Sequence, residues 1–440
     1  MTTDKKRMWG WLLYDWASQP YSTVLLTFTF APFFTSFVVG DPVKGQAVWA
    51  FMISAVGIVL ALSAPVLGAI SDVTKVRRPW IVFFSLLYVF GAAGLWWAVP
   101  GMENYFWILV LFAIGLLGME LSLVFVNSLI PDITNREDTG SLSGNGFALG
   151  YVGGLVLLFI MLLFFMEQDN GKTLIGMAPP FGLDAAMKEG TRLAGPLSAL
   201  WYVVFMLPFF LWVKEERPTK KVQNVVGTAI SNLVKTIRSM FDNVSLGSYM
   251  VSSMFYRDAL FATYTFGGIY ASGVLGWSIT QIGIFGIVAG VAAALFTWIG
   301  GFLDKKYGPK RVIIACIWVL VVVCVLIVGT SRETFFGAVL SQGSTFPDKV
   351  LWVCGVALGA AGGILQAASR TMVIFQTESG RYTESFGIYA LAGKATAFLA
   401  PGIIGIFTTL TGSQRLGFAP VIILFFIGLA FLFWVQDKRE

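Results

Sequence analysis

Long apolar stretches separated by short polar segments run through this sequence of 440 residues. An α-helix rises about 1.5 Å per residue, so about 20 mostly apolar residues cross the hydrocarbon core of a bilayer. Twelve such stretches are present, near 10–39, 46–70, 79–99, 104–130, 143–166, 195–213, 247–272, 279–302, 310–329, 350–374, 384–409 and 416–435. The pattern predicts an all-α membrane protein with twelve transmembrane helices.

Composition indicates that lipid surrounds most of the chain. Hydrophobic residues make up 57% of the sequence and charged residues only 12%, and the mean hydropathy is +0.77. A soluble domain carries about 25% charged residues. The first apolar stretch is longer than a secretion signal and holds Asp15 and Pro20, so we expect it to be retained as the first transmembrane helix.

Lys and Arg are distributed unevenly among the segments that connect the predicted helices. With the N-terminus inside, 20 of the 30 fall in cytoplasmic segments and seven in outer loops. Because cytoplasmic loops accumulate basic residues, we expect both termini to be cytoplasmic. The net charge of +6 follows from this bias, so we expect no nucleic-acid partner.

Side chains that bind metals or carry redox chemistry are scarce. The chain has no His and only three Cys, namely Cys316, Cys324 and Cys354, all inside apolar stretches. Their spacing fits neither a disulfide framework nor a metal-ligand pattern, so we expect no metal and no cofactor. Any proton transfer has to use carboxylates, because no side chain with an unperturbed pKa near neutrality is present.

A charge-rich segment at 214–246 separates six apolar stretches from the next six. Its later part repeats apolar residues with helical spacing, which predicts an amphipathic helix at the membrane surface; a partly ordered linker is the alternative. We therefore predict an N-terminal six-helix bundle (1–213), a cytoplasmic linker (214–246) and a C-terminal six-helix bundle (247–440).

Two local patterns recur at matching positions in the two halves. A glycine, an aspartate four residues later and a basic cluster follow the second and the eighth stretch; the members are Gly68, Asp72, Arg77 and Arg78, then Gly300, Asp304, Lys310 and Arg311. In the opening helix of each half a tyrosine follows an aspartate by six residues, as in Asp15 with Tyr21 and Asp258 with Tyr264. These repeated patterns indicate a duplicated six-helix unit, which would allow one half to rock against the other.

Ionisable side chains inside the apolar stretches are the strongest functional signal. A charge at the bilayer centre costs about 2.5–3.5 kcal/mol even on the lenient insertion scale, and such groups usually face a cavity or a partner. We single out Asp15, Glu120, Asp258, Arg370 and Lys394, which all lie inside apolar stretches. We interpret them as lining a polar path.

Alternatives stand beside each of these residues. Glu120 could form a permanent ion pair with Lys394 or Arg370, and Asp258 could pair with its neighbour Arg257. Asn127 lies seven residues after Glu120, which places both on one helix face. Hydroxyl and amide groups also join helices by hydrogen bonds, and most of the aromatic side chains, Tyr21, Tyr264 and Tyr389 among them, could be packing or interface anchors.

Longer motif strings occur along the chain, namely Trp11-Leu-Leu-Tyr-Asp-Trp-Ala17, Asn127-Ser-Leu-Ile-Pro131, Phe181-Gly-Leu-Asp184, Gln366-Ala-Ala-Ser-Arg370 and Phe386-Gly-Ile-Tyr389-Ala-Leu-Ala-Gly-Lys394. Together they resemble one branch of the major facilitator superfamily, the unknown-major-facilitator or vacuole-effluxer-like family, over nearly the whole chain. Two departures occur. Arg257 and Ala259 flank the seventh-helix acid where Asn and Gly are expected, and the glycine of the loop signature is missing from the first copy and displaced to Gly308 in the second.

The resemblance implies two pseudo-symmetric six-helix bundles, alternating access, and helices 1, 4, 7 and 10 around the cavity. Four of the five buried charges fall on those helices. It implies that the two loop clusters dock against neighbouring helix ends and bias the outward-facing state; positive-inside topology is the alternative for their basic residues. Gly146, Gly150, Gly153 and Gly154 resemble a degraded antiporter motif, for which close helix packing is the alternative.

The function expected from these features is secondary active transport of a small polar solute. The resemblance favours efflux of amino acids or similar zwitterions, with proton coupling through Glu120, Asp258 or Asp15. The complete candidate cavity is Asp15, Tyr21, Glu120, Asn127, Asp258, Tyr264, Gln366, Arg370, Tyr389 and Lys394.

A drug or metabolite exporter with the same fold is one alternative. A non-transporting receptor or a membrane enzyme is another, although the chain lacks zincin, nucleophile-elbow and phosphate-loop motifs. We expect the solute, a proton and membrane lipid as partners, a monomer, and the inner membrane of a bacterium or a vacuolar-type membrane in a eukaryote.

Overall fold

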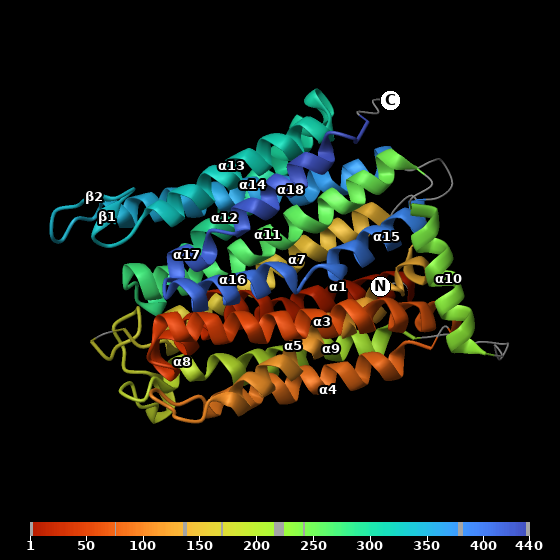
Figure 1. Ribbon diagram of the computed structural model, residues 1–440. Coiled ribbons are helices and arrows are strands. Elements are labelled where there is room, and N and C mark those ends of the chain that lie inside the picture. The colour runs from red at the N-terminus through yellow and green to blue at the C-terminus, as the bar shows by residue number, and fades with distance from the viewer. Residues whose placement is uncertain are drawn as a thin grey trace. The chain divides into compact units, whose positions relative to one another are not determined.

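The computed structural model describes residues 3–74, 76–134, 139–168, 170–214, 224–240, 243–376 and 382–436, most of which are helical (Figure 1). The elements of the first part, where η marks π or 3-10 helices, are α1 (Thr3–Pro20), η1 (Tyr21–Phe28), α2 (Phe30–Phe33), η2 (Phe34–Val38), α3 (Pro42–Thr74), α4 (Arg78–Gly94), η3 (Leu95–Trp97), α5 (Phe106–Asn127), α6 (Ile130–Ile133), α7 (Thr139–Ile160), η5 (Met161–Phe165), η6 (Pro180–Gly182), α8 (Glu189–Arg192), α9 (Ala194–Trp212) and α10 (Val225–Met240). Those of the second part are α11 (Val244–Leu275), α12 (Ile279–Tyr307), α13 (Pro309–Gly329), β1 (Thr334–Phe335), β2 (Ala338–Val339), α14 (Phe346–Gln376), α15 (Tyr382–Ala395), α16 (Leu399–Thr411), α17 (Gln414–Phe418) and α18 (Val421–Leu432).

Eleven helical segments among the described residues are long and apolar enough to cross a membrane. The predicted span 247–272 lies within α11, which has 32 residues but is not one of the eleven. Its serines and tyrosines, together with Arg257 and Asp258, lower its hydropathy. A helix is therefore present at each of the twelve predicted spans, and the least apolar of them carries the adjacent charges.

Several of the predicted spans are not continuous α-helices, and two of these, the first and the eleventh, carry predicted site residues. The first consists of α1, η1, α2 and η2, in which π-helical turns alternate with α-helix. Such turns often occur at functional sites. The eleventh is divided into α15 and α16 by a turn, where Ala397 N–H donates to Lys394 O and Leu399 N–H donates to Thr396 O.

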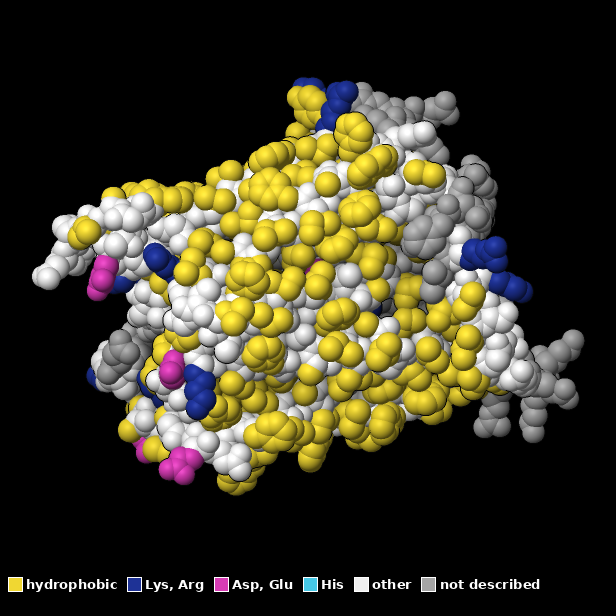
Figure 2. All heavy atoms as spheres, in the orientation of Figure 1, with side chains coloured by type: hydrophobic (Ala, Val, Ile, Leu, Met, Phe, Trp, Pro, Cys, Tyr) yellow, Lys and Arg dark blue, Asp and Glu magenta, His cyan; other side chains and the backbone are white. Residues whose placement is uncertain are grey.

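Large apolar side chains cover the outer faces of these helices. Leu62, Leu211 and Leu410 are 71%, 66% and 77% exposed. Figure 2 shows one face of the molecule, on which hydrophobic side chains predominate and charged side chains are few. A soluble monomer seldom exposes so many large apolar side chains to water. We conclude that lipid covers them and that the chain is a multi-pass membrane protein.

The chain forms two compact units. The first contains Met1–Asp41, Ser63–Asn232 and Ser278–Gly283, and the second contains Pro42–Leu62, Leu233–Trp277 and Ile284–Glu440. The first part of α3, Pro42–Leu62, thus belongs with the second unit, where Gln46 Nε2 donates to Thr408 Oγ1 (2.9 Å) and to Gln414 O (3.1 Å). The division into two bundles with boundaries at 213 and 247 stays a prediction.

Glycines allow close helix packing inside the first unit. On α7, a Cβ added to Gly153 would lie 2.7 Å from Trp16 O of α1, and one added to Gly154 would overlap the Thr23 hydroxyl of η1. Gly150 lies against Asp15, 3.2 Å from its Cβ by the same construction. These contacts favour the packing interpretation of the α7 glycines, because small residues let membrane helices approach closely.

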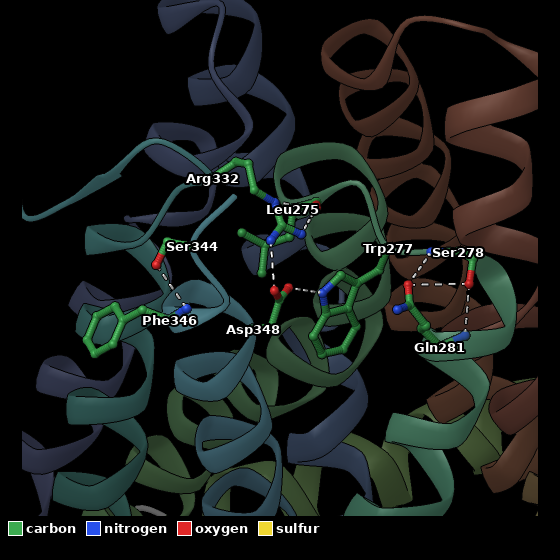
Figure 3. Close-up of polar contacts among 8 residues, drawn as sticks. All are labelled: Leu275, Trp277, Ser278, Gln281, Arg332, Ser344, Phe346 and Asp348. Atoms are coloured by element: carbon green, nitrogen blue, oxygen red, sulfur yellow. Dashed lines mark hydrogen bonds and ion pairs between the residues drawn. The ribbon is translucent and has the colours of Figure 1, made fainter. Parts of the chain in front are cut away.

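The second unit contains a similar ridge on α14. Gly355, Gly359 and Gly363, each four residues apart, face Phe285, Ala289 and Thr297 of α12. A capping box starts α12 at its other end: Ser278 Oγ accepts from Gln281 N–H (3.2 Å) and Gln281 Oε1 accepts from Ser278 N–H (2.9 Å), as Figure 3 shows.

We expect Gly359→Ala to lower the free energy of unfolding by about 1–3 kcal/mol, because overpacking a close contact forces backbone shifts. The added methyl group would overlap the Ala289 carbonyl oxygen, which cannot rotate away. Gly267→Ala on α11 is the matched control, since a Cβ there meets no atom within 4 Å. Unfolding in detergent measures both, and equal stability of the two variants would contradict the packing described here.

Candidate functional site

Asp15 lies on α1 and is partly exposed. Gly146 of α7 faces its carboxylate: a Cβ at that position would lie 2.5 Å from Asp15 Oδ2. Glu120, on α5, is also partly exposed, and Asn127 at the end of α5 is exposed. The first unit thus holds two acidic side chains within its apolar helices, each with part of its surface accessible.

Tyr21 has a packing role in this structure. Its side chain is fully buried, and its hydroxyl donates to Phe112 O over 2.6 Å. Its ring contacts Tyr88, with centroids 5.0 Å apart. Tyr14, another tyrosine that could contact solute by sequence, is also buried, and its hydroxyl lies 2.6 Å from Ser122 Oγ. Both join α1 or η1 to α5, as the packing alternative predicts.

The second unit contains a cluster of tyrosines around Arg257. The guanidinium carbon of Arg257 lies 4.1 Å from the centroid of the Tyr389 ring, and Nη1 donates to Tyr389 O over 2.9 Å. The Tyr389 ring stacks on Tyr249 at 6.3 Å, and the Tyr249 hydroxyl donates to Ser369 O over 2.5 Å. Helices α11, α14 and α15 therefore meet around one cationic side chain.

Asp258 acts as a cap for a broken helix. It is 5% exposed, and its Oδ2 accepts from Ala400 N–H over 2.8 Å at the start of α16. Its other oxygen, Oδ1, is buried and has no hydrogen-bond partner among the described residues. The alternative of an ion pair with Arg257 is wrong here, because the two neighbours point to different helices.

The remaining predicted residues of the second unit lie on the same three helices. The Tyr264 hydroxyl is 3.4 Å from Leu358 O and borders Gly362, whose carbonyl accepts from Gln366 Nε2 at 3.4 Å. Arg370 on α14 and Lys394 on α15 are partly exposed. Of these predicted residues, Tyr389 contacts Arg257, which the sequence had marked as a departure and as a possible partner of Asp258.

A family model described as "Vacuole effluxer Atg22 like" matches residues 35–440. The chain belongs to this family. An uncharacterized MFS-type transporter of Bacillus subtilis (YxiO) is 25% identical over 436 residues, which cover 98% of this chain and 95% of that protein. Autophagy-related protein 22 of Cryptococcus neoformans is 23% identical over 312 residues, covering 68% of this chain and 51% of the relative, so the chain spans about half the length of that relative.

Solved transporters share the fold of this Atg22-like chain. A D-xylose–proton symporter superposes with a TM-score of 0.67 at 14% identity, covering 99% of this chain and 98% of that one. The nucleoside transporter NupG gives 0.62 at 13% identity, with complete coverage of both chains. The predicted resemblance and the major-facilitator fold are confirmed. The Atg22-like chain is a transporter of this type, and its relatives and structural neighbours are transporters rather than enzymes.

The first of the two loop clusters contains an ion pair, between a buried arginine and an exposed aspartate, that the sequence did not predict. Arg77, whose side chain is 3% exposed, pairs with Asp132 of α6, which is 44% exposed. Arg78 Nη2 donates to Phe210 O at the end of α9 (2.7 Å). Gly68 is near Val124 of α5, and the Asp72 side chain lies outside the described residues.

The second loop cluster also contacts neighbouring helix ends. Asp304 is buried; its Oδ2 accepts from the Thr371 hydroxyl at 3.3 Å, and its Oδ1 has no partner among the described residues. Lys310 Nζ donates to Val435 O over 2.5 Å. Gly300 packs against Ile364 of α14, and Arg311 is exposed. A role of these loops in conformational gating stays a prediction.

At the other end of α12, a polar cluster connects three segments of the second unit (Figure 3). The Arg332 guanidinium donates to Leu275 O from Nε (2.9 Å) and to Asp348 Oδ2 from Nη1 (2.8 Å). Asp348 Oδ1 accepts from Trp277 Nε1 over 2.6 Å. This cluster was not predicted from the sequence, because its members come from three separate segments of the chain.

We expect Asp258→Ala to lower the free energy of unfolding by about 0.5–2 kcal/mol, the usual loss for a helix cap. Asp258→Asn should lose less than half as much, because an amide oxygen can still accept from Ala400 N–H. Unfolding of the purified variants in detergent gives both values. Equal losses would show that the charge of Asp258, and not the cap, stabilises the fold.

Stability should also depend on pH through Asp304, which lies beyond the apolar span Ile279–Thr297. Burial raises the pKa of Asp304 to about 6, whereas an unfolded aspartate has a pKa of about 3.9. The contribution to stability is therefore fully present below about pH 4 and is lost as the pH rises through about 6. Between pH 4.5 and 7, Asp304→Asn should show a smaller fall in melting temperature than the unmodified protein. The exposed Asp184→Asn is the control and should retain the original fall.

Proposed function

We propose that this chain is a secondary active transporter that exports amino acids or similar zwitterions by alternating access, coupled to protons. The observation that carries the proposal is the sign of the charges within the membrane-spanning helices of each unit. Away from the ends of these helices, the first unit carries the carboxylates of Asp15 and Glu120. The second carries cations, Arg257, Arg370 and Lys394, together with Asp258, whose carboxylate caps α16.

A zwitterion carries both of the charges that such groups attract. Carboxylates bind an ammonium group and guanidinium or ammonium groups bind a carboxylate, and these attractions are stronger away from bulk water. The description of the matching family as effluxers supports the direction of transport.

Alternating access is supported by the fold, in which helix pairs pack through glycine contacts inside each unit. In alternating access, one helix bundle rocks against the other as a rigid body. We propose the N-terminal bundle 1–213 and the C-terminal bundle 247–440 as these bodies, joined by the segment that contains α10. Its residues Val226, Ile230 and Val234 are exposed at helical spacing, as expected for a helix that rests on a membrane surface.

Proton coupling would use Glu120 or Asp15, because both carboxylates are partly exposed. Asp258 is a weaker candidate, since one of its oxygens is occupied by the α16 backbone. A coupling carboxylate has to gain and lose its proton during the cycle, which an acceptor for a fixed backbone amide does less readily.

Purified protein in proteoliposomes should exchange labelled amino acids by counterflow and accumulate them faster under a pH gradient. Glu120→Gln should retain counterflow and lose the gradient-driven component, because exchange of bound solute needs no net proton movement. Glu103→Gln, in the loop before α5, is the matched control and should retain both. If wild-type protein moves no amino acid in either assay, the solute class proposed here is wrong, and stabilisation by other compounds would then identify the alternative.

A further inference from the structure

Arg257 lies near the middle of α11 on a face that the other helices cover only in part. Arg257, Phe261, Tyr264 and Gly267 follow one another at spacings of four, three and three residues, which places them on one side of a helix. All four are partly exposed. A Cβ added to Gly267 would meet no atom within 4 Å, so this face borders open space.

The guanidinium of Arg257 is held in place on one side. It lies flat enough over Tyr389 to bring its carbon 4.1 Å from the ring centroid, and Nη1 donates to Tyr389 O. Gly393 gives it room: a Cβ there would lie 2.5 Å from Nη2. Tyr249 stacks behind Tyr389. The cation is therefore positioned by an aromatic platform and a glycine.

The same guanidinium has no acidic partner in the described part of the chain. Its neighbour Asp258 is directed to Ala400, and the ion pairs of the described residues do not include Arg257. An arginine side chain has five N–H donors, and the contact with Tyr389 O uses one. A fixed positive charge inside a membrane helix normally has a counter-charge or faces an aqueous cavity.

We propose that Arg257 binds an anionic group of the transported solute, a carboxylate where the solute is an amino acid. This inference rests on the proposed function and adds to it the group that recognises one end of the solute. The planar guanidinium fork matches a carboxylate, which can accept two parallel hydrogen bonds from it. Tyr389 and Gly393 act as positioning residues, because they fix the guanidinium without touching the solute's anionic group.

A purely structural role for Arg257 makes a different prediction. If the side chain only ties α15 to α11, its removal would lower stability and leave the choice among ligands unchanged. The test therefore measures ligand preference together with stability.

The experiment is a thermal-shift titration of purified protein with pairs of probes at equal ionic strength: propionate against propionamide, and leucine against leucinamide. A ligand that binds only the folded state raises the melting temperature according to its concentration and affinity. We expect the carboxylates to stabilise wild-type protein at concentrations about 10 to 100 times lower than the amides, the range of a hydrogen-bonded charge pair.

Three variants separate the effects of charge and position. Arg257→Gln should bring the carboxylate and the amide within about threefold of each other. Arg257→Lys should keep part of the preference, because it keeps the charge without the fork. Gly393→Ala keeps the arginine but displaces its guanidinium, and should reduce the preference without removing it. Arg415→Gln, on α17, is the control and should behave as wild type.

Two outcomes would overturn the proposal: no carboxylate preference in wild-type protein, or an unchanged preference in both Arg257→Gln and Gly393→Ala. If Arg257→Gln does not fold, Gly393→Ala and Arg257→Lys decide the question. The protein could show a carboxylate preference that depends on Arg257 and still move no amino acid in proteoliposomes. That result would support the anion site and contradict only the proposed class of solute.

Discussion

The free energy of a charge in hydrocarbon governs this structure more than any other term. A charged side chain inside a membrane helix costs several kcal/mol unless a partner or water compensates it. The chain solves this in different ways at neighbouring positions. Asp258 accepts a hydrogen bond from the backbone of α16, and Arg257 lies over an aromatic ring. Charges near the helix ends, where water is close, form ion pairs such as Arg77 with Asp132.

Basic side chains at helix ends have a second use beyond topology. Arg78, Arg332 and Arg192 donate to carbonyl oxygens at or near the C-terminal ends of helical segments, namely Phe210, Leu275 and Trp96. The last carbonyls of a helix lack intrahelical partners, and the helix dipole favours positive charge there. The predicted cytoplasmic position of the basic loops would account for the overall bias of Lys and Arg. The contacts with helix-end carbonyl oxygens explain the positions of the individual residues Arg78, Arg332 and Arg192.

Sequence alone predicted the helices and the family, because hydropathy over about 20 residues and local strings of motif residues are both local properties. It could not predict the turn between Ala395 and Leu399, since the turn depends on a carboxylate supplied by another helix. Tyr21 was assigned to the cavity because contacts supplied by another helix cannot be read from the sequence. Its six-residue spacing from Asp15 is a repeat in sequence, whereas its buried hydrogen bond to Phe112 O depends on how α5 packs.

For the adjacent residues Arg257 and Asp258, the sequence motif and the geometry of the structure favour different residues for contact with solute. The motif draws attention to the acid, which recurs in the opening helix of each half. Successive residues on an α-helix point about 100° apart, so only one of the two can face a given direction. The carboxylate turns to the N-terminus of α16, where the helix dipole favours negative charge. The guanidinium is then left on the partly open face, which makes the basic residue the better candidate for contact with solute.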